Sequence, residues 1–304
     1  MKKNKIIIDT DPGVDDALAI AFAVKAKLTI EAICTVYGNS TIKNSTINAQ
    51  SILKMIETNI PIYQGADMPM RGQGKLAQSH GDNGLGGFYL KSNKKISKKS
   101  ALEYYRSILS ESNAEGITIV AIGPTTNIGQ LINKYPEVID KIDKIVIMGG
   151  VFGEYGNISQ YAEFNVYNDP YSLELILKSK IKEIIIIPAN ICRKVIFTKE
   201  LFNSIDNPKL SSNLSKISEM YINYYSDNSE YGGFKGGVMY DLLIIALLIN
   251  PNSFSVKKEK VIVETKNKNK FGMTEIVKGT SNCKVITDVK ADELKELYIK
   301  VMNK

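Results

Sequence analysis

Cysteine is scarce in this sequence of 304 residues, and its arrangement excludes two kinds of stabilising site. Only Cys34, Cys192 and Cys283 occur, an odd number without the spacing of metal ligands. An odd number of widely separated cysteines indicates neither a disulfide framework nor a zinc site. Unpaired thiols fit a reducing compartment, so we expect a cytoplasmic protein.

Long hydrophobic runs are also lacking. The longest apolar run spans residues 242–249, far short of the roughly 20 residues that a membrane-spanning helix needs. The N-terminus carries basic residues, but Asp9 follows three isoleucines, too soon for the core of a signal peptide. The sequence therefore predicts a soluble protein without a membrane partner.

Arginine is rare, although the formal net charge is +7. The arginines are Arg71, Arg106 and Arg193, and lysine supplies the rest of the positive charge. Proteins that read nucleic acids favour the planar fork of arginine. The lysine-rich runs that begin at Lys91 and Lys266 are instead typical of solvated surfaces. We expect no nucleic-acid partner.

The sequence does contain the composition of an ordinary globular protein, with 44% hydrophobic and 23% charged residues. Single α/β domains often reach this length, so one domain over residues 1–304 is the first expectation.

Five short apolar runs predict the strands of a parallel sheet. They are hydrophobic on both faces, as strands covered by helices are. Longer stretches with helical spacing separate them and give repeated strand–helix–strand units. The predicted strands are residues 5–9, 30–38, 117–123, 144–150 and 183–190. The fold class is therefore α/β, with a single doubly wound, mostly parallel, Rossmann-like sheet, flanking helices and small C-terminal strands.

Each predicted strand ends in a polar or glycine-rich segment. In open α/β sheets, ligands bind beyond the carboxyl ends of the strands. We expect the functional site at this edge of the sheet. Residues 65–100 show little periodicity, which predicts a long loop beside the site.

The first strand leads into a dense cluster of carboxylates, Asp9, Asp11, Asp15 and Asp16. Capping a helix uses one aspartate. Four crowded carboxylates repel one another unless a cation is bound, and hard oxygen ligands suit Ca²⁺ or Mg²⁺. The cluster therefore predicts a metal site.

Two known families open with this kind of sequence. Haloacid-dehalogenase-type phosphatases begin with a strand and Asp-x-Asp, in which Asp9 and Asp11 would be nucleophile and acid. That family usually has Gly-Thr after the second aspartate, where this chain has Pro12-Gly13. The second pair of aspartates, Asp15 and Asp16, has no role in that family of phosphatases. A phosphatase remains an alternative function.

The whole chain resembles the inosine-uridine-preferring nucleoside hydrolases, from about Lys5 to the C-terminal helix. The opening DTDPGVDDALAI looks like the signature of that family, and further motifs follow in its order. These are VYGN at Val36, HGDNGLGG at His80, GPTTNIG at Gly123, MGG at Met148, AEFNVYNDP at Ala162, and Asp241 before a helix. The resemblance implies an enzyme that hydrolyses the N-glycosidic bond of ribonucleosides to free base and ribose.

The resemblance further implies a Ca²⁺ ion at the floor of the cavity. Its ligands would be the carboxylates of Asp11, Asp16 and Asp241 and the carbonyl of Thr126. Asp11 would also be the general base that takes a proton from a Ca²⁺-bound water. This is physically consistent, because a bound dication makes water more acidic. We expect Asp9 to support the loop.

The resemblance also implies residues that bind the nucleoside. Asp15 would take a ribose hydroxyl, since neighbouring helical residues point about 100° apart and Asp16 holds the metal. Glu163 and Asn165 lie two apart, as expected for residues that face one way from an extended segment. The other implied substrate-binding residues are Asn39, Met148 and Asn157.

The sequence departs from the family's pattern where the base leaves. The family commonly has histidine directly before the last metal-binding aspartate, but this chain has Tyr240. A phenol is a much weaker acid than an imidazolium, with reference pKa values of about 10 and about 6.5. We predict that Tyr240 stacks on the base and that the single histidine, His80, helps it to leave. Solvent, Tyr224 or Tyr225 are the other sources from which the base could be protonated.

The alternative from another functional class is a nucleoside-binding protein that no longer catalyses hydrolysis. Tyr240 in place of the family's histidine would be the sign of that loss. The family implies salvage of bases in the cytoplasm by a homodimer or homotetramer. The sequence leaves open whether purine or pyrimidine nucleosides are preferred.

Overall fold

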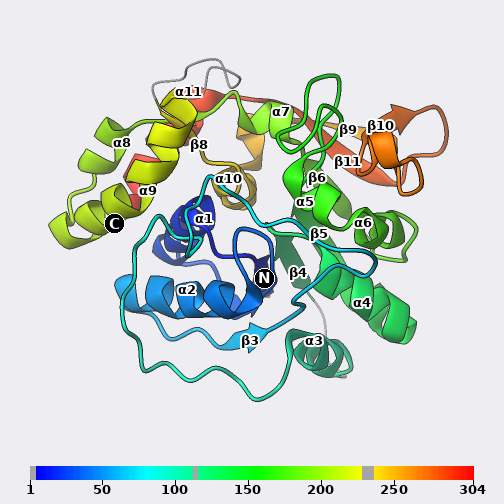
Figure 1. Ribbon diagram of the computed structural model, residues 1–304, viewed down its shortest axis with the longest axis horizontal. Helices are drawn as coiled ribbons and strands as arrows, with labels where there is room; N and C mark the ends of the chain where they lie inside the picture. The colour runs from blue at the N-terminus through cyan, green and yellow to red at the C-terminus, as the bar shows by residue number, and fades with distance from the viewer. Residues whose placement is uncertain (1–4, 112–115, 228–235) are drawn as a thin grey trace.

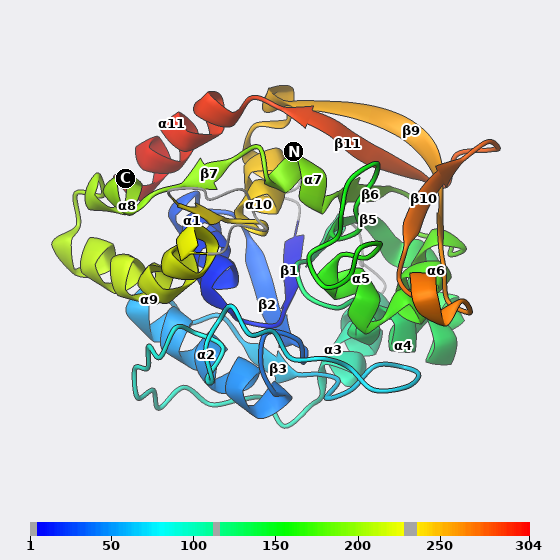
Figure 2. The same ribbon diagram turned by 45° about the horizontal axis from the view of Figure 1, so that its top comes forward.

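The computed structural model of the chain describes residues 5–111, 116–227 and 236–304. Within these residues, nine strands form one sheet in the order β10-β9-β11-β6-β5-β4-β1-β2-β3. Figures 1 and 2 show the C-terminal strands β9, β10 and β11 together on one side of the molecule. The strands of this sheet are β1 (Lys5–Thr10), β2 (Ile30–Thr35), β3 (Ile62–Gln64), β4 (Ile117–Ala121), β5 (Ile142–Met148), β6 (Ile184–Ile187), β9 (Phe254–Val263), β10 (Thr274–Val277) and β11 (Cys283–Val289).

Most of the sheet is parallel. Strands β1 to β6 and β11 run parallel to one another, whereas β9 pairs antiparallel with β11 and β10 pairs antiparallel with β9 at one edge. A separate antiparallel pair consists of β7 (Ile196–Phe197) and β8 (Gly237–Val238). The parallel arrangement places the carboxyl ends of β1, β2, β4, β5 and β6 along one edge.

Helices cover both faces of the sheet. Helices α1, α2, α9, α10 and α11 pack on one face, and α3, α4 and α6 pack on the other (Figure 2). The helices are α1 (Val14–Lys25), α2 (Ile42–Met55), α3 (Ala101–Leu109), α4 (Thr126–Lys134), α5 (Phe164–Asn168), α6 (Pro170–Leu177), α7 (Ala189–Cys192), α8 (Lys199–Asn203), α9 (Pro208–Asp227), α10 (Leu242–Ile249) and α11 (Ala291–Met302). Short 3₁₀ turns span Pro136–Lys141, Pro251–Ser253 and Lys268–Lys270.

Polar side chains define where several helices begin. The hydroxyl of Thr41 accepts a hydrogen bond from the Asn44 amide at the start of α2. Ser100 and Glu103 form a reciprocal capping box at the start of α3. Such a cap stabilises a helix by about 1 kcal/mol. These local signals explain why the predicted helical stretches begin where they do.

The structure confirms the predicted fold class. The five predicted strands appear as β1, β2, β4, β5 and β6, and the small C-terminal strands are β9, β10 and β11. Strand β3 was not predicted, because three residues are too few for a period to emerge. Residues 65–100 contain neither helix nor strand, as expected of a long loop. Among the residues described, no helix is long and apolar enough to cross a membrane.

Candidate active site

A pocket of about 540 Å³ opens beyond the carboxyl ends of the parallel strands. Nine of the predicted site residues line it, and they come from six separate segments of the chain. They are Asp15, Asn39, His80, Met148, Asn157, Glu163, Asn165, Tyr240 and Asp241. The predicted residues Asp11, Asp16 and Thr126 are buried and do not line the pocket itself.

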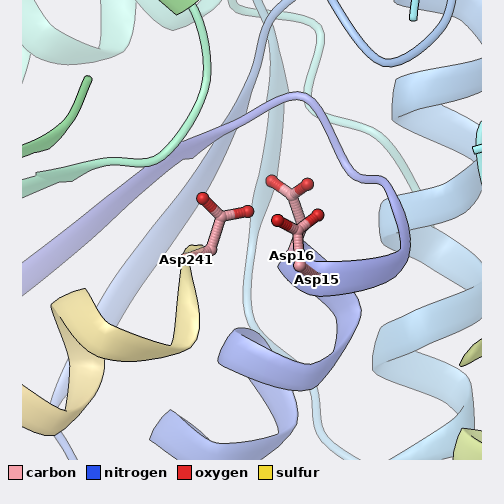
Figure 3. Close-up of side chains that lie close together, drawn as sticks. All are labelled: Asp15, Asp16 and Asp241. Atoms are coloured by element: carbon pink, nitrogen blue, oxygen red, sulfur yellow. The ribbon is translucent and has the colours of Figure 1, made fainter. Parts of the chain in front are cut away.

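Three carboxylates converge at the floor of this pocket, where Asp15 and Asp241 line it and Asp16 is buried behind them. Asp15 and Asp16 stand on the first turn of α1 and face Asp241, which directly precedes α10 (Figure 3). One oxygen from each lies within 4.8 Å of the others, and all three residues are buried. The sequence placed Asp15 on the ribose and Asp11 on the metal, whereas the tightest group of oxygens contains Asp15.

Asp16 is held in place by hydrogen bonds from three residues. Its carboxylate accepts from the hydroxyl of Thr10, the amide of Gly13 at 2.9 Å and the side-chain amide of Asn39 at 3.0 Å. A negative charge at this position also interacts favourably with the N-terminus of α1. The network fixes the orientation of the Asp16 carboxylate before any ligand binds.

Asp11 lies beside the three converging carboxylates, and only one of its two carboxylate oxygens accepts a hydrogen bond. One oxygen accepts the Asn39 amide at 2.7 Å, and the other has no hydrogen-bond partner. Burial, and next the charge of Asp16, raise the pKa of Asp11 well above its ordinary value. One oxygen of Asp15 is also buried without a partner. Unpaired buried carboxylate oxygens are costly without a cation, so this floor fits a hard divalent metal.

Two glycines allow the chain to pass close to these carboxylates. Gly38 has a φ of +152°, and a β-carbon there would overlap the Asp11 carboxylate. A β-carbon at Gly13 would stand 2.5 Å from the Asn39 side-chain nitrogen and 2.7 Å from His80 Nδ1. A side chain at position 38 would therefore displace the Asp11 carboxylate, and one at position 13 would displace Asn39 and His80.

His80 reaches the start of α1 from the long loop. Its Nδ1 accepts the Val14 amide at 3.1 Å and lies 4.0 Å from an oxygen of Asp15. Burial lowers the pKa of His80 from 6.5 to about 3. The imidazole is therefore neutral near pH 7 and carries its proton on Nε2, because Nδ1 is an acceptor.

Four tyrosines, Tyr221, Tyr224, Tyr225 and Tyr240, form a second wall of the pocket. The hydroxyl of Tyr225 donates to that of Tyr240 at 3.4 Å, and Tyr221 donates to the carbonyl of Val238 at 2.8 Å. The ring of Tyr221 also lies 4.9 Å from that of His80. Burial raises the pKa of Tyr240, so the phenol stays protonated and can donate one hydrogen bond. This wall can stack against a flat aromatic ligand.

Amide and carboxyl groups from α5 and the preceding loop form a third wall. Glu163 caps α5 and accepts the amides of Asn165 at 2.8 Å and Val166 at 3.1 Å. The expectation of an extended segment here was wrong, because this cap starts a helix at Phe164. Asn165 donates from its side chain to the carbonyl of Met148 at 3.2 Å.

Asn157 and Thr126 are each tied to a neighbouring helix. The side-chain oxygen of Asn157 accepts the Phe164 amide at 2.7 Å, which joins this loop to α5. Thr126 is fully buried at the start of α4, and its hydroxyl donates to Asp169 at 2.8 Å. Asp9 accepts hydrogen bonds from Tyr105 and Asn127 behind the site, in line with the supporting role expected of it.

Several pocket residues were missed at the level of sequence. Tyr221 was not named, although its spacing of four from Tyr225 puts both on one face of a helix. Lys75 and Gln78 also line the pocket, and their loop offers no period from which a direction could be inferred.

The chain matches one protein family over nearly its full length. The sequence model of the inosine-uridine preferring nucleoside hydrolases matches residues 6–296. A pyrimidine-specific ribonucleoside hydrolase, RihA, of Escherichia coli O8 is 36% identical over 276 residues, which cover 88% of this chain and 87% of that protein. The probable uridine nucleosidase 1 of Oryza sativa subsp. japonica is 34% identical over 270 residues, covering 86% and 82%.

The fold agrees with this match. The solved structure of the plant nucleoside hydrolase PpNRh1 is similar with a TM-score of 0.90 over 99% of both chains, at 28% sequence identity. These similarities favour a nucleoside hydrolase over the phosphatase alternative. The chain belongs to the inosine-uridine preferring nucleoside hydrolase family and is an N-glycosyl hydrolase.

Proposed function

We propose that this enzyme hydrolyses ribonucleosides to base and ribose at a Ca²⁺-dependent centre in which Asp11 is the general base. The observation that carries the proposal is the convergence of the buried carboxylates of Asp15, Asp16 and Asp241, with Asp11 beside them. Asp11 and Asp15 each have one buried oxygen without a hydrogen-bond partner. Such a floor is suited to a hard cation and to the hydroxyls of a sugar.

Asp11, Asp16 and Asp241 would hold the ion, with the carbonyl of Thr126. Bound Ca²⁺ would make a water molecule more acidic and give the ribose hydroxyls a positive charge to bind. Asp11 is suited to accept a proton from that water, because its unpartnered oxygen is buried and its other oxygen is fixed by Asn39. Calcium fits the all-oxygen ligand set better than zinc does.

Asp15 and the third wall would orient the ribose. The unpartnered oxygen of Asp15 can accept a ribose hydroxyl, and Asn39, Asn157, Glu163, Asn165 and Met148 are proposed to bind the rest of the sugar. Bond cleavage develops positive charge on the ribosyl ring, as in other glycoside hydrolyses. The surrounding carboxylates and amide oxygens stabilise that charge electrostatically.

The tyrosine wall would receive the base. Tyr240 can stack on a purine or pyrimidine ring and donate one hydrogen bond from its hydroxyl. His80 can also donate from Nε2, but its low pKa keeps it from carrying an extra proton near pH 7. Hydrogen bonding and stacking by His80 and Tyr240 would therefore assist departure of the base.

Release of reducing sugar from uridine, cytidine, inosine and adenosine tests the function. Uridine comes first, because similar proteins are named as uridine and pyrimidine-specific enzymes. Turnover that stops with a chelator and returns with Ca²⁺ supports the proposal. Binding of uridine without turnover would favour the binding-protein alternative, and turnover insensitive to the chelator would refute the metal centre.

2′-Deoxyuridine is the matched control substrate. A site built to bind a hydroxyl rejects an analogue that lacks it by up to about 10⁴-fold, because its polar groups are left unpaired. Equal efficiency on uridine and 2′-deoxyuridine would contradict the roles given to Asp15 and Asn165.

The remaining proposals concern the whole protein. We infer one domain over residues 1–304, since β1 and β11 from the two ends of the described chain belong to one sheet. The family resemblance supports a homodimer or homotetramer in the cytoplasm that salvages bases. Light scattering on the purified protein and fractionation of the host cell test these two points.

A further inference from the structure

The junction between α5 and α6 makes contacts that the proposed chemistry does not use. Asp169 is 1% exposed and accepts three hydrogen bonds. One of its oxygens accepts the Thr126 hydroxyl at 2.8 Å and the Met70 amide at 2.9 Å, and the other accepts the Ser172 amide at 3.1 Å. A single carboxylate oxygen thus joins the start of α4 to the long loop.

The two groups that share this oxygen belong to different parts of the site. Thr126 is the residue whose carbonyl is proposed to face the metal, so fixing its side chain also restricts where that carbonyl points. Met70 lies in the long loop, of which the segment 75–80 lines the pocket. The neighbouring Asn168 holds the same loop, because its side-chain oxygen accepts the Lys75 amide at 2.7 Å.

We propose that Asp169 is a positioning residue that holds the Thr126 turn beneath the metal and the Met70 segment of the pocket loop at the same time. A negative charge near the N-terminus of α4 is favourable, and a carboxylate can accept all three bonds. The role of Asp169 in holding Thr126 for the metal, here called the metal half of the proposal, rests on the proposed function. Its role in holding the Met70 segment, here called the loop half, does not.

Alanine in place of Asp169 removes all three acceptor bonds, so the Thr126 hydroxyl, the Met70 amide and the Ser172 amide all lose their partner. Asparagine is a weaker test, because its side-chain oxygen can still accept from both Thr126 and Met70. Partners in the second layer around a metal typically change its affinity by about 10- to 100-fold when mutated.

Calorimetric titration of the purified chain with Ca²⁺ tests the metal half. We expect Asp169→Ala and Thr126→Val to weaken binding by about 10- to 100-fold. Thr126→Ser keeps the hydroxyl and should restore the wild-type affinity. Ser172→Ala removes a buried hydroxyl that has no hydrogen-bond partner and is the matched control, with unchanged affinity.

Hydrogen exchange tests the loop half on the same proteins without metal. Asp169→Ala should speed exchange of the Met70 amide, whereas Thr126→Val should not. If Asp169→Ala fails to fold, comparison of Thr126→Val with Thr126→Ser still decides the role of Asp169 and Thr126 in metal binding. Equal Ca²⁺ affinity of Thr126→Val and Thr126→Ser, or an unchanged Met70 amide in a folded Asp169→Ala, would overturn the proposal.

Failure of the proposed function would look different. Wild-type protein that binds no Ca²⁺ would refute the metal centre and with it the metal half. The exchange rate of the Met70 amide would still decide the role of Asp169 in the loop.

Discussion

Asp11 is the residue on which the proposed chemistry depends most. We expect Asp11→Ala to lower kcat/KM on uridine by about 10²- to 10⁴-fold, the usual contribution of a general base. The melting temperature should change little, because the loss of one bond to Asn39 is offset by relief of repulsion among buried carboxylates. Steady-state kinetics and thermal denaturation measure both effects, and an undiminished rate would refute the assignment.

His80 offers a direct test because it is the single histidine of the sequence. Its folded pKa of about 3 lies below the ordinary 6.5, and a cation in the carboxylate cluster would lower it further. We expect the imidazole Cε1–H signal of untagged protein to stay constant between pH 9 and 5, with the proton on Nε2.

The same shift predicts how stability depends on pH. Below pH 6.5 the unfolded chain takes up a proton at this histidine that the folded protein takes up only near pH 3. The contribution of His80 to the free energy of unfolding is therefore fully present above pH 6.5. It is lost as the pH falls from 6.5 to about 3. A histidine signal that titrates near pH 6.5 in folded protein would contradict both expectations.

Two substitutions of Tyr240 distinguish a stacking role from a proton-donating role. If the ring stacks on the base, Tyr240→Phe retains most activity, whereas Tyr240→Ala loses about 10- to 100-fold, the usual effect of removing an aromatic ring that stacks on a base. Kinetics on natural nucleosides and on p-nitrophenyl riboside, whose leaving group needs no acid, measure the difference. Comparable losses in both variants on natural nucleosides, with p-nitrophenyl riboside spared, would assign proton donation to Tyr240.

At the scale of elements, the turn between β1 and α1 carries most of the site. We expect Gly13→Ala to lower both the melting temperature and kcat/KM, since its β-carbon would press on Asn39 and His80 at once. Overpacking of this kind costs about 1 to 3 kcal/mol. Chemical denaturation and kinetics check this, and a variant with wild-type values in both would show that the turn is not tightly packed.

The elements also show where prediction from sequence stops. The central strands were predictable because they are hydrophobic on both faces, and the long loop because it has no period. The direction of α9 was predicted only in part. Tyr224 and Tyr225 were expected near the base and do line the pocket, whereas Tyr221 was not expected there and lines it because α9 packs beside α1. Glu163 was misjudged for a similar reason, because its carboxylate caps α5 instead of continuing an extended segment.

At the scale of the whole molecule, metal binding should be visible as stability. A ligand that binds only the folded state at 100 times its Kd stabilises it by about 2.7 kcal/mol. We therefore expect Ca²⁺ to raise the melting temperature and a chelator to lower it. Asp241→Asn, which alters one carboxylate of the cluster, should reduce this increase. A melting temperature that does not respond to Ca²⁺ would argue against a resident ion.

The sequence by itself determined the α/β class, the edge of the sheet that carries the site, and the family. Each of these depends on local periodicity or on the order of short motifs, which a linear chain displays. Only the tertiary structure decided that Asp15 joins Asp16 and Asp241, that His80 is neutral, and that Asp169 links Thr126 to the long loop. Those properties depend on burial and on contacts between residues far apart in the chain, and neither is visible in a sequence.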